Sequence, residues 1–178
     1  MSARSGVTGG TALATETLEL IATNWDTANY DPQPILHHRD EGKRYDPAGG
    51  GTTDTLARDG DLRQNNIVTV SYEGRTTDPV GTEFDFDVEA EVDIAIEGLT
   101  ADPAPIPDAE AWRTLVDEVR RAILETRHYP IVDPSCRYSY RWLSFTQETD
   151  EPFEEENRNR YNTRLSLSWY GYEDLPEI

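Results

Sequence analysis

The stretch FDFDVEAEVDIAIEG, residues 84–98, alternates apolar side chains with mostly acidic ones along its whole length. A period of two is that of a β-strand, whose successive side chains point to opposite faces of a sheet. We therefore expect a half-buried strand with one apolar face packed on a core. Its other face would carry a row of carboxylates: Asp85, Asp87, Glu89, Glu91 and Asp93.

Repulsion within this acidic row is small compared with the burial on the other face. Neighbours on one face lie roughly 6.7 Å apart, so each like-charge pair costs about 0.6 kcal/mol in water, and salt lowers this. Each buried Phe, Val or Ile returns about 1.5–3 kcal/mol. Burial on the other face therefore outweighs the repulsion within the row. Four explanations for the row are open: metal binding, acid–base chemistry, repulsion of a polyanion, or plain hydration of a strand face.

The composition indicates a folded protein adapted to concentrated salt. The 178 residues include 35 acidic and 16 basic ones, a net charge of −19, and Lys43 is the only lysine. A disordered acidic tail is the competing explanation, but the acids are interleaved with periodic apolar residues and four tryptophans. This charge disfavours a phosphate-binding groove. No apolar run suits a signal peptide or a membrane span, so we expect no membrane partner.

The remaining pattern predicts a single α+β domain over residues 11–178, preceded by a flexible arm at residues 1–10. Strands are expected at residues 35–39, 67–74, 136–147 and 160–172, beside the acidic strand at 84–98. Residues 75–81 would form a turn, residues 45–66 a long loop, and residues 148–159 an acidic hairpin tip. In CRYSYRWLSFTQ, residues 136–147, one face would carry Tyr138, Tyr140 and Trp142. We predict a mainly antiparallel sheet of about four to five strands with two helices packed on one face.

Both helices are predicted from apolar stripes at helical spacing. The first begins at Thr11, a candidate N-cap, and would bury Ala14, Leu18, Ile21 and Trp25. The second follows the candidate N-cap Asp108 and would bury Trp112, Leu115, Val116, Val119 and Ile123.

No motif predicts catalysis, a cofactor or a metal site. The Gly-rich PAGGGTT lacks the lysine of a phosphate-binding loop. His37 and His38 are adjacent and would point to opposite faces of a strand, so they cannot share a metal. Asp59 and Asp61 flank a glycine but lack the later glutamate of a calcium loop. We expect no enzyme activity.

The element order resembles that of the tail-terminator (tail-completion) proteins of tailed viruses. The segments that carry the resemblance are TALATETLELIATNW, PILHHRD, NNIVTVSYEG, FDFDVEAEVDIAIEG, AEAWRTLVDEVRRAIL and RLSLSWYGY, and they span residues 11–172. The resemblance implies α+β subunits in a hexameric ring that caps the tail tube and joins it to the head. With this composition, the virus would infect salt-loving archaea, and the protein would be assembled in the host cytoplasm into the virion.

The resemblance implies as partners the chain itself, a tail-tube protein and a head-side connector protein, with DNA passing through the ring unbound. On this reading the acidic row lines the lumen. The interface candidates are aromatic and arginine residues near the last strand: Arg158, Arg160, Arg164, Trp169, Tyr170 and Tyr172. Two alternatives stay open. One is another neck or head-closure protein, and the other is a small halophilic enzyme or ligand-binding domain holding a cation at Asp59, Asp61 or Asp85 with Asp87.

Overall fold

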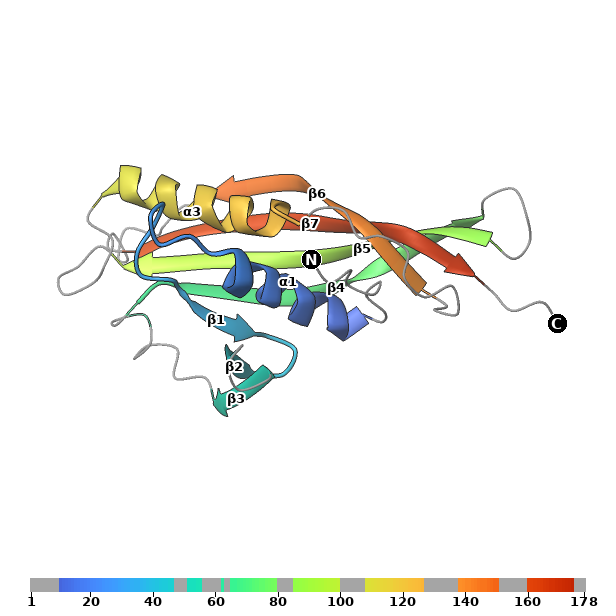
Figure 1. Cartoon of the computed structure of the whole chain (residues 1–178), viewed down its shortest axis with the longest axis horizontal. Helices are drawn as coiled ribbons and strands as arrows, with labels where there is room; N and C mark the ends of the chain where they lie inside the picture. The colour runs from blue at the N-terminus through green and yellow to red at the C-terminus, as the bar shows by residue number, and fades with distance from the viewer. Residues whose placement is uncertain are drawn as a thin grey trace.

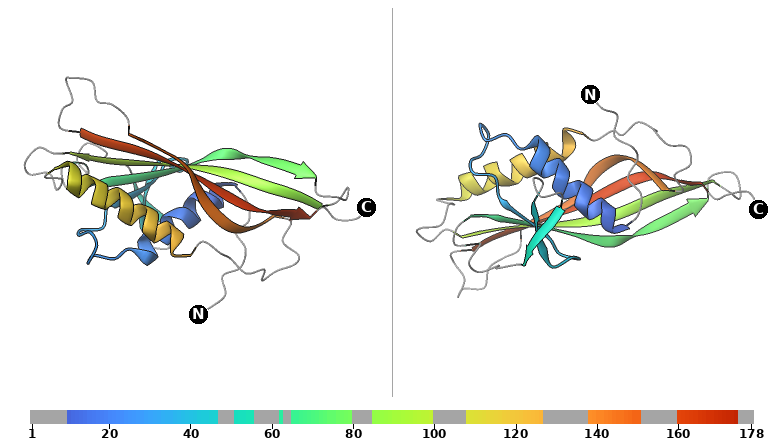
Figure 2. Two further views of the ribbon diagram at one scale, coloured as in Figure 1. Left: turned by 90° about the horizontal axis from the view of Figure 1, so that it is seen from above. Right: turned by 60° about the horizontal axis from the view of Figure 1, so that its bottom comes forward.

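The structure is a computed structural model that describes residues 10–46, 51–55, 62, 65–79, 85–99, 108–126, 138–150 and 160–174. Residues 1–9 of the expected arm, most of the expected loop 45–66 and residues 151–159 of the expected hairpin tip lie outside the described residues. The described elements form one seven-stranded sheet with two helices on one face, which confirms the α+β prediction (Figures 1 and 2).

The sheet order is β3-β2-β1-β4-β5-β7-β6. All neighbouring strands are antiparallel except β1 and β4, which run parallel. The strand bounds are β1 Ile35–His38, β2 Lys43–Asp46, β3 Gly51–Thr55, β4 Ile67–Pro79, β5 Asp85–Leu99, β6 Tyr138–Asp150 and β7 Arg160–Asp174. The acidic strand β5 is an interior strand of the sheet and pairs with β4 on one side and with β7 on the other.

The sheet has more strands than the sequence predicted, and several predicted boundaries were wrong. The predicted loop 45–66 contains β3 and the end of β2, which extend the sheet beyond β1. The predicted turn 75–81 begins instead as strand, because β4 continues to Pro79 and pairs with β5 as far as Phe86. A register shift at Tyr72–Gly74 divides β4, and Gly74 has the positive φ of 132° that favours glycine.

Both helices lie on the same face of the sheet. They are α1 Gly10–Asn24 and α3 Ala109–Leu124. The helices also contact each other, since the Asn24 side-chain amide donates to the carbonyl of Ala122 at 2.9 Å. Figure 2 shows both helices on one side of the sheet, and the described residues place no helix on the other side.

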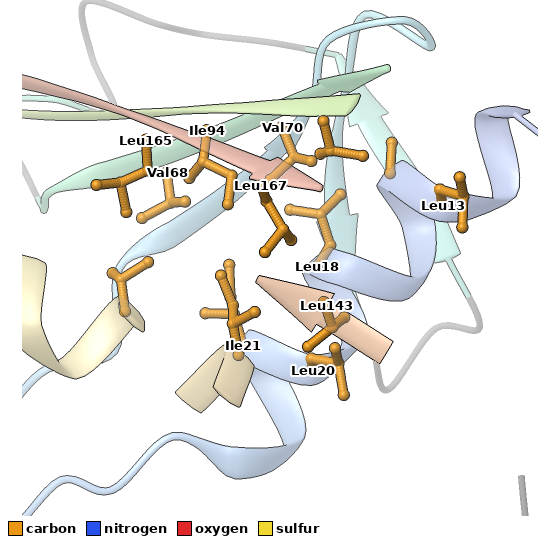
Figure 3. Packing of buried hydrophobic residues seen from close by; sticks show 14 of the residues in the cluster. Leu13, Leu18, Leu20, Ile21, Val68, Val70, Ile94, Leu143, Leu165 and Leu167 are labelled. Carbon is orange, nitrogen blue, oxygen red and sulfur yellow. The ribbon is translucent and has the colours of Figure 1, made fainter. Parts of the chain in front are cut away.

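The core lies between the helices and the inner faces of β4, β5 and β7. Figure 3 shows apolar side chains of α1 facing those of the sheet. From the acidic strand, the core takes Val88, Ala90, Val92, Ile94 and Ile96, all at most 2 % exposed. All five predicted apolar residues of α3 are buried, and the Asp108 carboxylate caps that helix by accepting from the amide of Ala111. Helix α1 begins one residue before Thr11, which therefore lies within the helix and is not its N-cap.

A β-bulge in β6 changes which face its aromatic residues occupy. The register against β7 shifts between Tyr140 and Trp142. Tyr140 is buried in the core, whereas Trp142 is 37 % exposed on the face that carries no helix. The prediction that these two rings share a face was therefore wrong, because the extra residue of the bulge interrupts the period of two.

Candidate interaction surface

The candidate site is the sheet face opposite the helices, which we call the open face. Every second residue of β5 belongs to it, because the residues between them are in the core. Strand β5 pairs with β4 and β7 over most of its length, so the side chains opposite its acids belong to the open face as well. The pleat of β5 thus places the acidic row between side chains of two other long strands.

The acidic row is exposed along most of its length. Asp87, Glu89 and Glu91 are exposed, while the Asp93 side chain is 17 % exposed and lies 3.5 Å from the Arg164 guanidinium. Asp85 begins β5, and its side chain lies outside the described part. From Asp87 to Asp93 the row extends about 20 Å at the rise of a strand.

Two of these carboxylates differ in what they contact. Glu89 accepts a hydrogen bond from the Ser168 hydroxyl at 2.8 Å. Asp87 stands opposite Asp78 of β4 in the strand register, a like-charge pairing that destabilises a sheet. Within the described ranges, neither Asp78 nor Asp87 makes a hydrogen bond or ion pair with a side chain. This end of the row therefore carries uncompensated negative charge.

Three aromatic rings lie beside the acids at the same end of the open face. Trp142 of β6 stacks on Tyr170 of β7, with ring centroids 6.1 Å apart and planes at 19°. Tyr172 meets Trp142 edge-on, with centroids 6.1 Å apart. The strand register places Tyr170 opposite Glu89 and Tyr172 opposite Asp87. The two tyrosines are thus direct cross-strand neighbours of the carboxylates, and Trp142 lies one strand further along the sheet.

The aromatic rings and acids enclose a shallow groove of about 300 Å³, which we call the aromatic–acid groove. Its charged and aromatic lining residues are Asp78, Asp87, Glu89, Trp142, Tyr170 and Tyr172. A second groove of about 440 Å³ adjoins it, since Thr76 and Glu89 line both. The second groove contains Glu73, Glu91 and one cation, Arg75. Together the two grooves form a track over β4 and β5 with an acidic excess.

The predicted interface residues lie in different parts of the structure, some on the open face and one in the core. Tyr170 and Tyr172 lie on the open face, next to the predicted lumen residues and not on a separate surface. Trp169 is fully buried in the core, where its indole N–H donates to the Thr17 hydroxyl at 3.3 Å. Trp169 is therefore removed from the interface candidates, because its neighbours within the subunit cover it completely.

The three predicted arginines also occupy different environments. Arg164 pairs with Asp93 at the other end of the acidic row. Arg160 is exposed at the first position of β7. Arg158 lies outside the described residues. The sequence missed Trp142 as a member of the site, since only the register of β6 against β7 brings it to Tyr170.

Acids near α3 are paired within the subunit, unlike those at the aromatic end of the row. Glu148 and Asp150, expected in the acidic hairpin tip, belong to β6 and pair with Arg113 and Arg120 of α3. The hydrogen bond from Arg113 lowers the pKa of Asp150, and a bond from the Thr163 hydroxyl adds to this. These residues attach the helix to the edge strand, so they act in the fold.

Glu118 is a buried acid that the sequence did not reveal. Its side chain is 2 % exposed and accepts hydrogen bonds from the Asp26 amide, the Asn29 side chain and the Arg121 guanidinium. Burial raises the pKa of Glu118, but the bonds from Arg121, Asp26 and Asn29 outweigh it, so the pKa is lowered. This carboxylate joins α3 to the segment after α1.

The described residues hold no cluster of three or more His, Cys, Asp or Glu side chains with the geometry of a metal site. His37 and His38 are both buried, and His38 contacts the Thr15 hydroxyl at 3.1 Å. Asp59 and Asp61 lie outside the described residues. Among the helices described, none has both the length and the apolar character needed to cross a bilayer.

Comparison with known proteins gives no family assignment: no protein-family model matches the chain, and no curated protein matches its sequence. The class that the fold defines is an α+β domain with one helix-covered sheet face and one acidic sheet face on which the described residues place no helix.

Proposed function

We propose that this chain is a structural virion protein, a tail terminator that forms a ring at the head–tail junction of a virus of salt-loving archaea. In this role it caps the tail tube, contacts a head-side connector protein and lets DNA pass. It acts by assembly and not by catalysis.

One observation carries the proposal: the exposed acidic row of the open face, Asp87, Glu89 and Glu91, on a strand whose other face is fully buried. Closed rotational symmetry would repeat the row around a hole. Carboxylates facing DNA repel its phosphates, so the duplex would slide without being bound. The helix-covered face would then point outward or toward neighbouring subunits.

The order of elements supports the same proposal. A first helix, a sheet built on long strands, a single second helix and a closing β6–β7 hairpin follow one another as the resemblance implies. Another neck or head-closure protein would share the ring and the acidic lumen, and it is distinguished by its partner and not by its fold.

The test is the mass of the purified protein in 2 M KCl by multi-angle light scattering, followed by negative-stain imaging. A hexamer would have a mass of about 121 kDa, six times the 20.1 kDa of one chain. A ring with a central hole is expected, either free or after addition of purified tail tubes. A monomer that ignores both tail tubes and head connectors would refute the proposal.

The lumen assignment has its own test in a charge reversal, Glu91→Arg. Rings of this variant should retain DNA fragments in a filter-binding assay, while the matched variant Glu110→Arg on exposed α3 should not. Equal retention by both variants would place Glu91 outside the lumen.

A further inference from the structure

A lumen that only repels DNA does not require the aromatic–acid groove. Its central ring belongs to Trp142, which is 37 % exposed. Among the residues that the structure describes, this is the one large apolar side chain that is exposed. A smooth channel needs charge but no aromatic surface. An exposed tryptophan supported by two tyrosines is typical of a contact surface, where aromatic residues are enriched.

The chemistry of the groove suits a cation with a flat, weakly hydrated surface. The stacked pair Trp142 and Tyr170 offers ring faces that attract a cation through the ring quadrupole. Asp87 and Asp78 supply negative charge at the same place, and no side chain of the described part neutralises them. An incoming cation would also relieve the repulsion between these two opposed carboxylates.

We infer that the groove binds arginine side chains on an extended segment of a partner protein. A guanidinium stacks on an aromatic face and bonds a carboxylate through two N–H groups at once, whereas a lysine ammonium does neither. Its weaker hydration also suits concentrated salt, in which unstacked ion pairs are screened. The adjoining groove of about 440 Å³ extends the site along β4 and β5, so the track fits a chain segment better than a compact ligand.

Charge complementarity selects the partner. A second copy of this chain carries a net charge of −19 and would bring more acid than base to an acidic track. Its exposed Arg164 already pairs with Asp93. A nucleic acid is repelled by the same carboxylates. A different protein with an arginine-bearing segment is the occupant that matches both the rings and the charge.

This inference deepens the proposed function, because it gives the chemistry of the neighbour at one end of the acidic row. The row is about 20 Å long, so exposed Glu91 can face the lumen while the end with Asp87 and Trp142 lies at the rim. The rim is where a tail-tube protein or a head-side connector would dock. The groove itself exists in a single subunit, so its test needs no ring.

The experiment is a titration of the ¹⁵N-labelled full chain in 2 M KCl, followed by the indole N–H signals of its four tryptophans. The probes are three synthetic peptides in which glycine alternates with arginine, lysine or neutral citrulline. The Trp142→Phe variant assigns the signal of interest. The arginine peptide should shift the Trp142 signal and bind at least about threefold more tightly than the lysine peptide, and the citrulline peptide should not bind.

Substitutions distinguish binding of the peptide in the groove from its nonspecific electrostatic attraction to an acidic protein. Trp142→Ala, measured by isothermal titration calorimetry because it lacks the reporting indole, and Asp87→Asn should each bind the arginine peptide about two- to fivefold more weakly. Glu110→Gln, an exposed acid on α3, is the matched control and should leave binding unchanged. Because Trp142 and Asp87 are exposed, neither substitution removes core packing.

The inference is overturned by no shift of the Trp142 signal, by equal affinity for the arginine and lysine peptides, or by an affinity that neither groove variant changes. A Trp142 signal that moves with protein concentration and not with peptide would assign the groove to a second copy, which also overturns it. A ring that ignores the peptide rejects this inference alone. A chain that binds the peptide but forms no ring rejects the proposed function alone.

Discussion

Replacing Glu118 by alanine should destabilise the protein far more than replacing any exposed acid of the same helix. The Glu118 side chain is 2 % exposed and accepts four hydrogen bonds of 2.6–2.8 Å, two of them from Arg121. Its removal leaves the Asp26 amide without its acceptor and removes two hydrogen bonds of the Arg121 guanidinium, which still donates to Glu125 and to the Asn24 carbonyl. The helix α3 would then lose its attachment to the segment after α1.

The magnitude follows from the exposure of the donors. Losing one partner of a fully buried pair costs about 3–5 kcal/mol, and a hydrogen bond to a charged group contributes about 1.5–3 kcal/mol. The Arg121 side chain is 36 % exposed and Asn29 is exposed, so water replaces part of what is lost. We therefore expect a loss of about 2–3 kcal/mol for Glu118→Ala, or a fall in Tm of roughly 4–12 °C.

The assay is urea unfolding at constant 2 M KCl, followed by far-ultraviolet circular dichroism. Urea is uncharged, so the screening of ion pairs stays fixed through the titration. Glu125→Ala is the matched control, since Glu125 pairs with the same Arg121 at 3.1 Å but is 61 % exposed. The control should lose at most about 0.5 kcal/mol. Losses that agree within 0.5 kcal/mol for the two variants would refute the assigned role of Glu118.

Three further predictions concern acid and aromatic residues. Because the pKa of Glu118 is lowered, its ionised carboxylate stabilises the fold above the ordinary glutamate range, and this stabilisation is lost as the pH falls through the lowered value. The difference in unfolding free energy between wild type and Glu118→Gln should therefore shrink below about pH 4.5, and a constant difference would contradict this. Trp169→Ala should cost about 3–5 kcal/mol in urea unfolding and Trp142→Ala less than about 1 kcal/mol, since the first ring is in the core and the second is exposed; equal losses would contradict the assigned faces. Asp87→Asn removes repulsions with Glu89 and with the opposed Asp78, each about 0.6 kcal/mol or somewhat more before screening, so it should stabilise the fold at low KCl and have little effect above 1 M. Destabilisation at every salt concentration would show that the Asp87 carboxylate has a favourable partner.

The elements that the sequence predicted well are long and strictly periodic. The alternation of residues 84–98 predicted β5 within about one residue, and the apolar stripe of α3 was buried completely. The strands β2 and β3 were missed because they are four and five residues long, polar and without a period. They extend the sheet from β1 through backbone pairing, which side-chain patterns do not encode.

Less of the candidate site could be predicted, because it depends on how strands pair. The acidic row could be predicted from one strand alone, since alternation places its members on one face. The groove needs the register of β5 against β7 and of β7 against β6, and a bulge moves Trp142 to the open face. Trp169 and Tyr170 were equal candidates in the sequence, yet neighbours in a strand face opposite ways, so one became core and the other surface.

The distribution of ion pairs argues that the acidic row is kept for an external partner. Acids that support the helices are matched with arginines: Glu118 with Arg121, and Glu148 with Arg120. At the aromatic end of the row, Asp87 has no such match within the described part and stands opposite another aspartate. The fold does not need that charge, since burial on the inner face of β5 stabilises the strand. Under the proposed function, this charge would repel DNA along the row, and under the inferred groove it would attract arginine at the end that carries Trp142.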